Sequence, residues 1–166
     1  MSKLKVVGVG EFAVSNTPDE IIKTFALGSC VAVIFLHQPT RTVGLIHIAL
    51  PDSSVSPEMV DNRPAYFADT GIPVILRAMA SLTFCPSPLK PQGMVVKLAG
   101  GANVLDSNNT FNIGKRNVLT IKRMLWSMGM GPVAEDVGGA ISRTVSVPVE
   151  SGRVFLSCPT KGEWEI

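Results

Sequence analysis

The chain has 166 residues, 46% hydrophobic and only 17% charged, which excludes an intrinsically disordered protein and predicts one folded domain over residues 1–166. The net charge is +2, and the fifteen basic residues are spread out without interleaved aromatic residues, so we expect no nucleic-acid binding. No apolar run of about 18 residues and no leader-like N-terminus is found, which predicts no membrane insertion and a cytoplasmic location.

The first half of the chain is predicted to form short strands separated by turns. Fifteen glycines and twelve prolines lie between apolar runs, which favours such a fold over a helical bundle. The apolar run Lys5–Val9 predicts a strand that continues past a bend through residues 10–14, before a turn at residues 15–19. Further strands are expected at Ile21–Phe25, Val31–Leu36 and Val43–Leu50.

The second half mixes helices and strands. A helix is expected at Ile72–Leu82, capped by Asp69 or Thr70, and another at Ile113–Met128 after Asn112. The remaining apolar runs predict strands at Met94–Ala99, Pro132–Val137, Arg143–Val149 and Arg153–Ser157. These patterns together predict a single α+β domain.

The cysteines indicate a free thiol rather than a disulfide framework. There are three, Cys30, Cys85 and Cys158, with no CxxC pair. An odd count without paired spacing favours neither disulfides nor a zinc cluster. We interpret Cys85 and Cys158 as structural and expect neither a metal nor an organic cofactor.

A hairpin brings Cys30 towards a histidine. The predicted turn centres near residues 39 and 40, so antiparallel neighbours should have numbers that sum to about 79. Cys30 and His47 sum to 77, which places them opposite or one diagonal step apart, whereas His37 lies in the turn itself. A thiol within reach of an imidazole is the arrangement of a cysteine nucleophile and its base.

The residues before Cys30 add an oxyanion-binding hypothesis. Gly28 and Ser29 allow a tight turn whose backbone N–H groups would stabilise an oxyanion, and these dipoles with a protonated His47 would lower the thiol pKa. The alternative is a buried cysteine that acts as a small hydrophobic residue beside a core histidine. The residue types alone leave both interpretations open.

Several motifs follow one another in a fixed order along nearly the whole chain. The N-terminal blocks are Thr24-Phe-Ala-Leu-Gly-Ser-Cys30 and Val43-Gly-Leu-Ile-His47-Ile-Ala-Leu-Pro51-Asp52. The later blocks are Tyr66-Phe-Ala-Asp69-Thr70-Gly-Ile-Pro73, Lys97-Leu-Ala-Gly100-Gly101-Ala-Asn103, Asn112-Ile-Gly114-Lys115-Arg116-Asn117, Ala134-Glu135-Asp136-Val-Gly138-Gly139 and Ser142-Arg143-Thr144. Together these blocks resemble the CheD family of chemoreceptor glutamine deamidases, although Ala140-Ile141 departs from the polar residues that many members carry there.

The resemblance implies a Cys-His-Thr triad at Cys30, His47 and Thr24 that hydrolyses glutamine side chains of methyl-accepting chemoreceptors. It also implies a fold like that of cytotoxic necrotizing factor toxins, a mixed β-sheet sandwich flanked by helices in α/β/β/α-like layers. Some members are credited with cleaving receptor glutamyl methyl esters, and members bind CheC, a phosphatase of the response regulator. The alternatives are a non-catalytic regulator of a CheC-type phosphatase and, with less support, a metal or redox site at Cys30 and His47.

Overall fold

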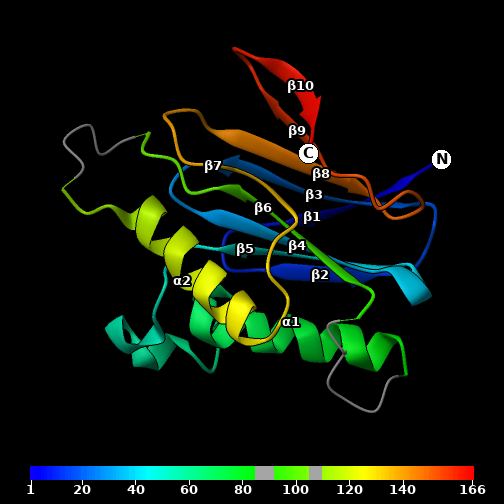
Figure 1. Cartoon of the computed structure of the whole chain (residues 1–166), viewed down its shortest axis with the longest axis horizontal. Helices are drawn as coiled ribbons and strands as arrows, with labels where there is room; N and C mark the ends of the chain where they lie inside the picture. Colours follow the sequence, from blue (N-terminus) through cyan, green and yellow to red (C-terminus); the bar gives the residue numbers. More distant parts are fainter. Residues whose placement is uncertain (85–91, 105–109) are drawn as a thin grey trace.

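The computed structural model describes residues 1–84, 92–104 and 110–166, which form two five-stranded mixed sheets and two α-helices (Figure 1). The predicted loop around Cys85 lies outside the described residues. One sheet has the strand order β1-β3-β8-β9-β10, with bounds Lys3–Val7, Glu20–Leu27, Arg143–Pro148, Phe155–Cys158 and Gly162–Glu165. The other has the order β2-β5-β4-β6-β7, with bounds Phe12–Ser15, Thr42–Ile48, Val31–His37, Met94–Gly100 and Ala134–Val137.

Both sheets are mixed. The pairs β1–β3 and β6–β7 are parallel, and the other neighbouring strands are antiparallel. The long helices are α1, Ala68–Leu82, and α2, Ile113–Ser127. Single 3₁₀ turns occupy Gln38–Thr40, Ser53–Val55, Pro57–Met59 and Pro64–Tyr66.

Strand β4 lies at the centre of the molecule because both of its faces are apolar. Val31, Val33 and Phe35 belong to a core shared with α1 and α2, whereas Ala32 and Ile34 belong to the core between the two sheets. Each large apolar side chain buried in this way contributes about 1.5–3 kcal/mol to folding. The continuous apolar run after Cys30 therefore fixes the nucleophile candidate at the end of the innermost strand.

The α+β class and the mixed-sheet sandwich are confirmed. Among the described residues both α-helices cover the same sheet, the one that contains β4, so the order of layers is helices, sheet, sheet (Figure 1). No helix in residues 1–84, 92–104 or 110–166 combines the length and the apolar character that a membrane crossing requires.

Two element predictions were wrong in detail, and one strand was not predicted. The segment predicted to continue β1 is β2 in the opposite sheet, because the chain turns at Gly10 with φ of 73°. Helix α1 begins before the predicted caps, with Phe67 as its N-cap residue, and the Asp69 carboxylate accepts hydrogen bonds from the N–H and hydroxyl of Ser53 instead. The short strand β10 was not predicted, because its sequence Gly-Glu-Trp-Glu lacks an apolar run.

Candidate active site

The β4–β5 hairpin has the register that the sequence predicts. Val31 pairs with Ile48 and Ala32 pairs with His47, so paired residue numbers sum to 79. Cys30 directly precedes β4 and lies two positions before Ala32, on the same face of the strand by alternation. Cys30 and His47 are therefore diagonal cross-strand neighbours facing the core between the sheets, against which Cys30 packs.

Thr24 reaches His47 from the opposite sheet. Its strand, β3, belongs to the other layer of the sandwich, and its hydroxyl oxygen lies 2.7 Å from Nδ1 of His47. The same hydroxyl donates to the carbonyl of Val7, also at 2.7 Å. Thr24 therefore links the two sheets at the histidine.

This chain of hydrogen bonds determines the tautomer of His47. A threonine hydroxyl has one proton, and the Val7 carbonyl can only accept, so the Thr24 proton is used there. The Nδ1 atom of His47 must then carry a proton and donate it to Thr24. The Nε2 atom of the neutral ring is left unprotonated, and within the described residues it is buried without a hydrogen-bond partner. That is the state of a general base.

Burial keeps the imidazole neutral. His47 is 1% exposed, and its desolvation between the sheets lowers its pKa from 6.5 to about 4. The nearby Glu11 carboxylate, which accepts a 2.7 Å hydrogen bond from the N–H of Gly8, opposes this shift by raising the pKa of His47. At neutral pH the ring is uncharged and able to accept a proton.

The electrostatic environment of Cys30 differs from the sequence-based expectation. Burial raises the pKa of the Cys30 thiol above its ordinary value, and the residue's own N–H lowers it in part. The prediction that a protonated His47 lowers the thiol pKa was wrong, because the sandwich desolvates both groups and the imidazole is neutral. The resting pair is a neutral thiol beside a neutral imidazole. Cys30 as a whole residue is only partly buried.

The backbone from Gly28 to Cys30 has all three of its carbonyls anchored. The carbonyls of Gly28 and Cys30 accept from the N–H groups of Ala102 and Gly101, each at 2.8 Å. The Ser29 carbonyl accepts from Nδ2 of Asn117 at 3.0 Å. In the part of the chain that the structure describes, the N–H groups of Gly28, Ser29 and Cys30 donate to no backbone carbonyl.

The anchored carbonyls orient these N–H groups. In a trans peptide the C=O of one residue and the N–H of the next point in opposite directions. The Ser29 and Cys30 N–H groups are therefore directed away from the anchors, so neither of them is used to hold the turn. The predicted oxyanion residues Gly28 and Ser29 thus lie next to the nucleophile candidate.

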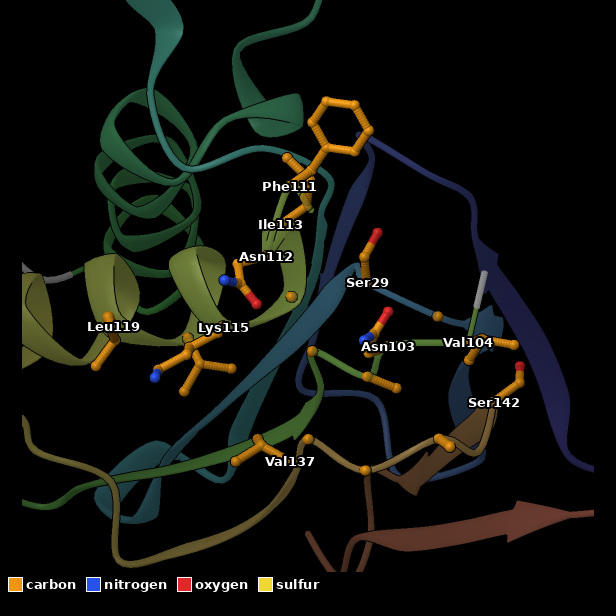
Figure 2. Close-up of a pocket in the computed structure, with 18 of the residues that line it drawn as sticks. Ser29, Asn103, Val104, Phe111, Asn112, Ile113, Lys115, Leu119, Val137 and Ser142 are labelled. Atoms are coloured by element: carbon orange, nitrogen blue, oxygen red, sulfur yellow. The ribbon is translucent and has the colours of Figure 1, made fainter. Parts of the chain in front are cut away.

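A cavity of about 1050 Å³ opens beside this turn. Gly28 and Ser29 form part of its wall, together with the segment after β6, the N-terminal half of α2 and the segment between β7 and β8. Figure 2 shows Ser29 and Asn103 across the cavity from Lys115 and Leu119 of α2. Gly101, Ala102 and Asn103, which follow β6, thus contribute to the wall of the cavity.

Other polar candidates lie elsewhere. Cys158 is buried on β9, with its sulfur 3.5 Å from the hydroxyl of Thr160. Asp136 is on β7, where it pairs with Arg143 at 2.8 Å and accepts from Trp164. Among residues 1–84, 92–104 and 110–166, no three His, Cys, Asp or Glu side chains are grouped as metal ligands.

Three contributors to the site were not predicted. The Val7 carbonyl and the Glu11 carboxylate come from the N-terminal strands, whose approach to His47 is not visible in sequence. Asn117 had a detectable signal, because it lies at helical spacing between Ile113 and Ile121 on the buried face of α2. A polar residue in such an apolar stripe indicates a specific hydrogen-bonding role.

The fold and the site define a class of protein. It has two sheets and an α+β fold, and a partly buried cysteine precedes its central strand, near a histidine whose ring is hydrogen-bonded to a threonine. The chain belongs to the CheD family, because residues 49–158 match the family described as "CheD chemotactic sensory transduction".

Curated relatives agree over nearly the whole chain. The "Probable chemoreceptor glutamine deamidase CheD" of Syntrophotalea carbinolica is 48% identical over 97% of this chain and 98% of its own length. The "Chemoreceptor glutamine deamidase CheD" of Thermotoga maritima is 35% identical over 96% of this chain and 94% of its own length.

A solved structure shares the fold. The crystal structure of a Neisseria meningitidis protein of family DUF152 superposes with a TM-score of 0.53 and 10% sequence identity. The match covers 84% of this chain and 65% of that one, so this chain spans less than two thirds of it. At that identity the likeness concerns the fold alone.

Proposed function

We propose that this chain is a chemoreceptor glutamine deamidase, which hydrolyses the side-chain amide of glutamines in methyl-accepting chemoreceptors to glutamate and ammonia. Membership of the CheD family and the names of the relatives support the reaction and the substrate class. The observation that carries the assignment to this site is the Val7–Thr24–His47 chain, which leaves an unprotonated Nε2 on the strand beside Cys30.

In the proposed acylation step, Nε2 of His47 takes the thiol proton as the sulfur of Cys30 attacks the glutamine carbonyl carbon. The tetrahedral oxyanion is bound by the Ser29 and Cys30 N–H groups. As the intermediate collapses, the C–N bond breaks, the imidazolium gives its proton to the leaving nitrogen, and ammonia departs. The product is a thioester between Cys30 and the former glutamine side chain.

In the deacylation step, neutral His47 takes a proton from water while the water oxygen attacks the thioester carbonyl. The C–S bond then breaks, the proton returns to the sulfur, and glutamate is released with the thiol restored. The same route hydrolyses a glutamyl methyl ester, with methanol leaving in place of ammonia. Protein groups alone carry every proton in this sequence.

Because Cys30 and His47 are both neutral at rest, the mechanism makes a prediction about when the proton is transferred. Because burial raises the pKa of Cys30 and lowers that of His47, proton transfer accompanies attack instead of preceding it. Thr24 stabilises the transient imidazolium only as a neutral acceptor, which is weaker than a carboxylate. We therefore expect slow turnover, suited to a modification that resets receptors.

The test is mass spectrometry of receptor peptides after incubation of a receptor cytoplasmic fragment with each variant. Wild type and Cys158→Ala should convert particular glutamines to glutamate, and Cys30→Ala should lower the rate at least about 1,000-fold with its fold intact. Conversion by Cys30→Ala at the wild-type rate would refute the nucleophile assignment. The absence of conversion by wild type would refute the reaction itself.

We also propose a cytoplasmic location and a CheC-type phosphatase as partner, on the ground of the family resemblance. The face around the cavity carries exposed apolar side chains, Val104, Phe111 and Leu119, which suits a protein partner or substrate. A pull-down with CheC tests the partnership: wild type should be retained, and no retention would refute it. A purely regulatory role would leave Cys30→Ala fully functional in that assay and wild type without deamidase activity.

A further inference from the structure

Asn117 joins the two strand ends that carry the proposed nucleophile and base. Its side chain is fully buried in α2, and Nδ2 donates to the carbonyls of Ser29 and Ala49, each at 3.0 Å. Ser29 immediately precedes Cys30, and Ala49 is two residues after His47. One amide nitrogen therefore fixes both ends of the hairpin relative to α2.

We propose that Asn117 is a positioning residue for the acylation step: it holds the Ser29–Cys30 peptide so that the Cys30 N–H faces the developing oxyanion and the sulfur stays in reach of His47. This inference rests on the proposed function for the reaction, but its geometry is independent of the substrate. Asn117 itself contacts only backbone carbonyls and does not touch the reacting atoms.

The chemistry of the side chain fits this role closely. Both partners are carbonyl oxygens, which only accept, so the position requires two N–H donors on one atom, and an asparagine amide supplies them. An aspartate or leucine supplies none, and a serine supplies one. The two carbonyls also determine which end of the amide is nitrogen.

The remaining atom of the amide indicates that stability alone does not explain the residue. Within the described residues, Oδ1 of Asn117 is buried without a hydrogen-bond partner. Such an atom costs about 1–3 kcal/mol, and a buried unsatisfied group in a folded protein calls for a specific explanation. Fixing the Ser29–Cys30 peptide provides one.

Asn117 is also an anchor of this turn that a side-chain substitution can remove without altering the backbone. The Gly28 and Cys30 carbonyls are held by backbone N–H groups, whereas the Ser29 carbonyl is held by a side chain. Releasing it frees the Ser29–Cys30 peptide plane to rotate, and the Cys30 N–H rotates with it. The loss would affect oxyanion binding and also the thiol, because the Cys30 N–H lowers the pKa of the Cys30 sulfur.

The test compares Asn117→Leu with Ile121→Ala, a substitution on the same buried face of α2 at an apolar side chain that cannot hydrogen-bond to the turn. Both variants lose stability, which thermal unfolding measures. We expect Asn117→Leu to lower kcat by about 10–100-fold with KM changed less than about threefold, a loss somewhat below that of removing an oxyanion donor outright. Ile121→Ala should keep kcat within about threefold of wild type at a matched temperature below unfolding.

A second readout needs no substrate. The rate of Cys30 alkylation by iodoacetamide against pH should shift to higher pH in Asn117→Leu and stay at the wild-type position in Ile121→Ala. If Asn117→Leu fails to fold, Asn117→Ser keeps one donor and should show a smaller fall in kcat and a smaller shift. Equal kcat and equal alkylation profiles in the Asn117 and Ile121 variants would overturn the proposal. A wild type that is alkylated normally but deamidates nothing would instead refute the proposed function.

Discussion

Replacing Thr24 by valine tests how the base is prepared. Thr24→Val keeps the shape of a fully buried side chain but removes the hydroxyl, which leaves the Nδ1–H of His47 and the carbonyl of Val7 without a partner. Each unsatisfied group costs about 1–3 kcal/mol, so we expect the two together to lower the free energy of unfolding by about 2–6 kcal/mol.

Activity should fall as well, because the proton of His47 is no longer confined to Nδ1 and the ring loses its orienting contact. A loss of about 1.4–2.7 kcal/mol corresponds to a 10–100-fold lower kcat. This is smaller than the roughly 10⁴-fold effect of altering a charged carboxylate in a serine protease triad, since Thr24 is a neutral acceptor.

Ammonia release from a receptor cytoplasmic fragment measures kcat, and urea unfolding measures stability. The matched control is Thr24→Ser, which keeps the hydroxyl and both hydrogen bonds and should stay within about fivefold of wild-type kcat. A folded Thr24→Val protein with wild-type kcat, or a serine variant as impaired as the valine variant, would refute the role of the hydroxyl.

Two further predictions concern stability. The folded-state pKa of His47 is about 4 and its ordinary value is 6.5, so the unfolded chain binds the extra proton first as the pH falls. The free energy of unfolding should therefore fall by about 3 kcal/mol between pH 6.5 and pH 4, and a wild-type pH dependence in His47→Gln would contradict this. A Cβ on Gly114 would lie 2.5 Å from the carbonyl oxygen of Gly101 and 2.6 Å from that of Ala102. Gly114→Ala should therefore lower the melting temperature strongly, whereas Lys115→Ala at the neighbouring exposed position should not; equal melting temperatures of the two variants would show that α2 packs differently.

The local part of the site was predictable from sequence. The hairpin register follows from a short turn and two apolar strands, so the pairing that brings Cys30 near His47 can be counted from residue numbers. Helix α2 was also predictable within one residue, because its apolar positions recur at helical spacing and Gly129 follows.

The non-local part was not predictable by counting. Thr24 meets His47 across two sheets, and no spacing along the chain indicates which strands face each other in a sandwich, so only the family resemblance suggested it. The direction of the Cys30 pKa shift depends on how deeply the sandwich buries the thiol, which is a property of the packed layers.

The central claim, that Cys30 attacks the glutamine carbonyl, is tested most directly by trapping the intermediate. Wild-type protein mixed with a receptor fragment, quenched in acid and digested, should contain a thioester that joins the Cys30 peptide to a receptor glutamine peptide and is released by hydroxylamine. Product that accumulates without such an adduct, or an adduct on another residue, would contradict the account.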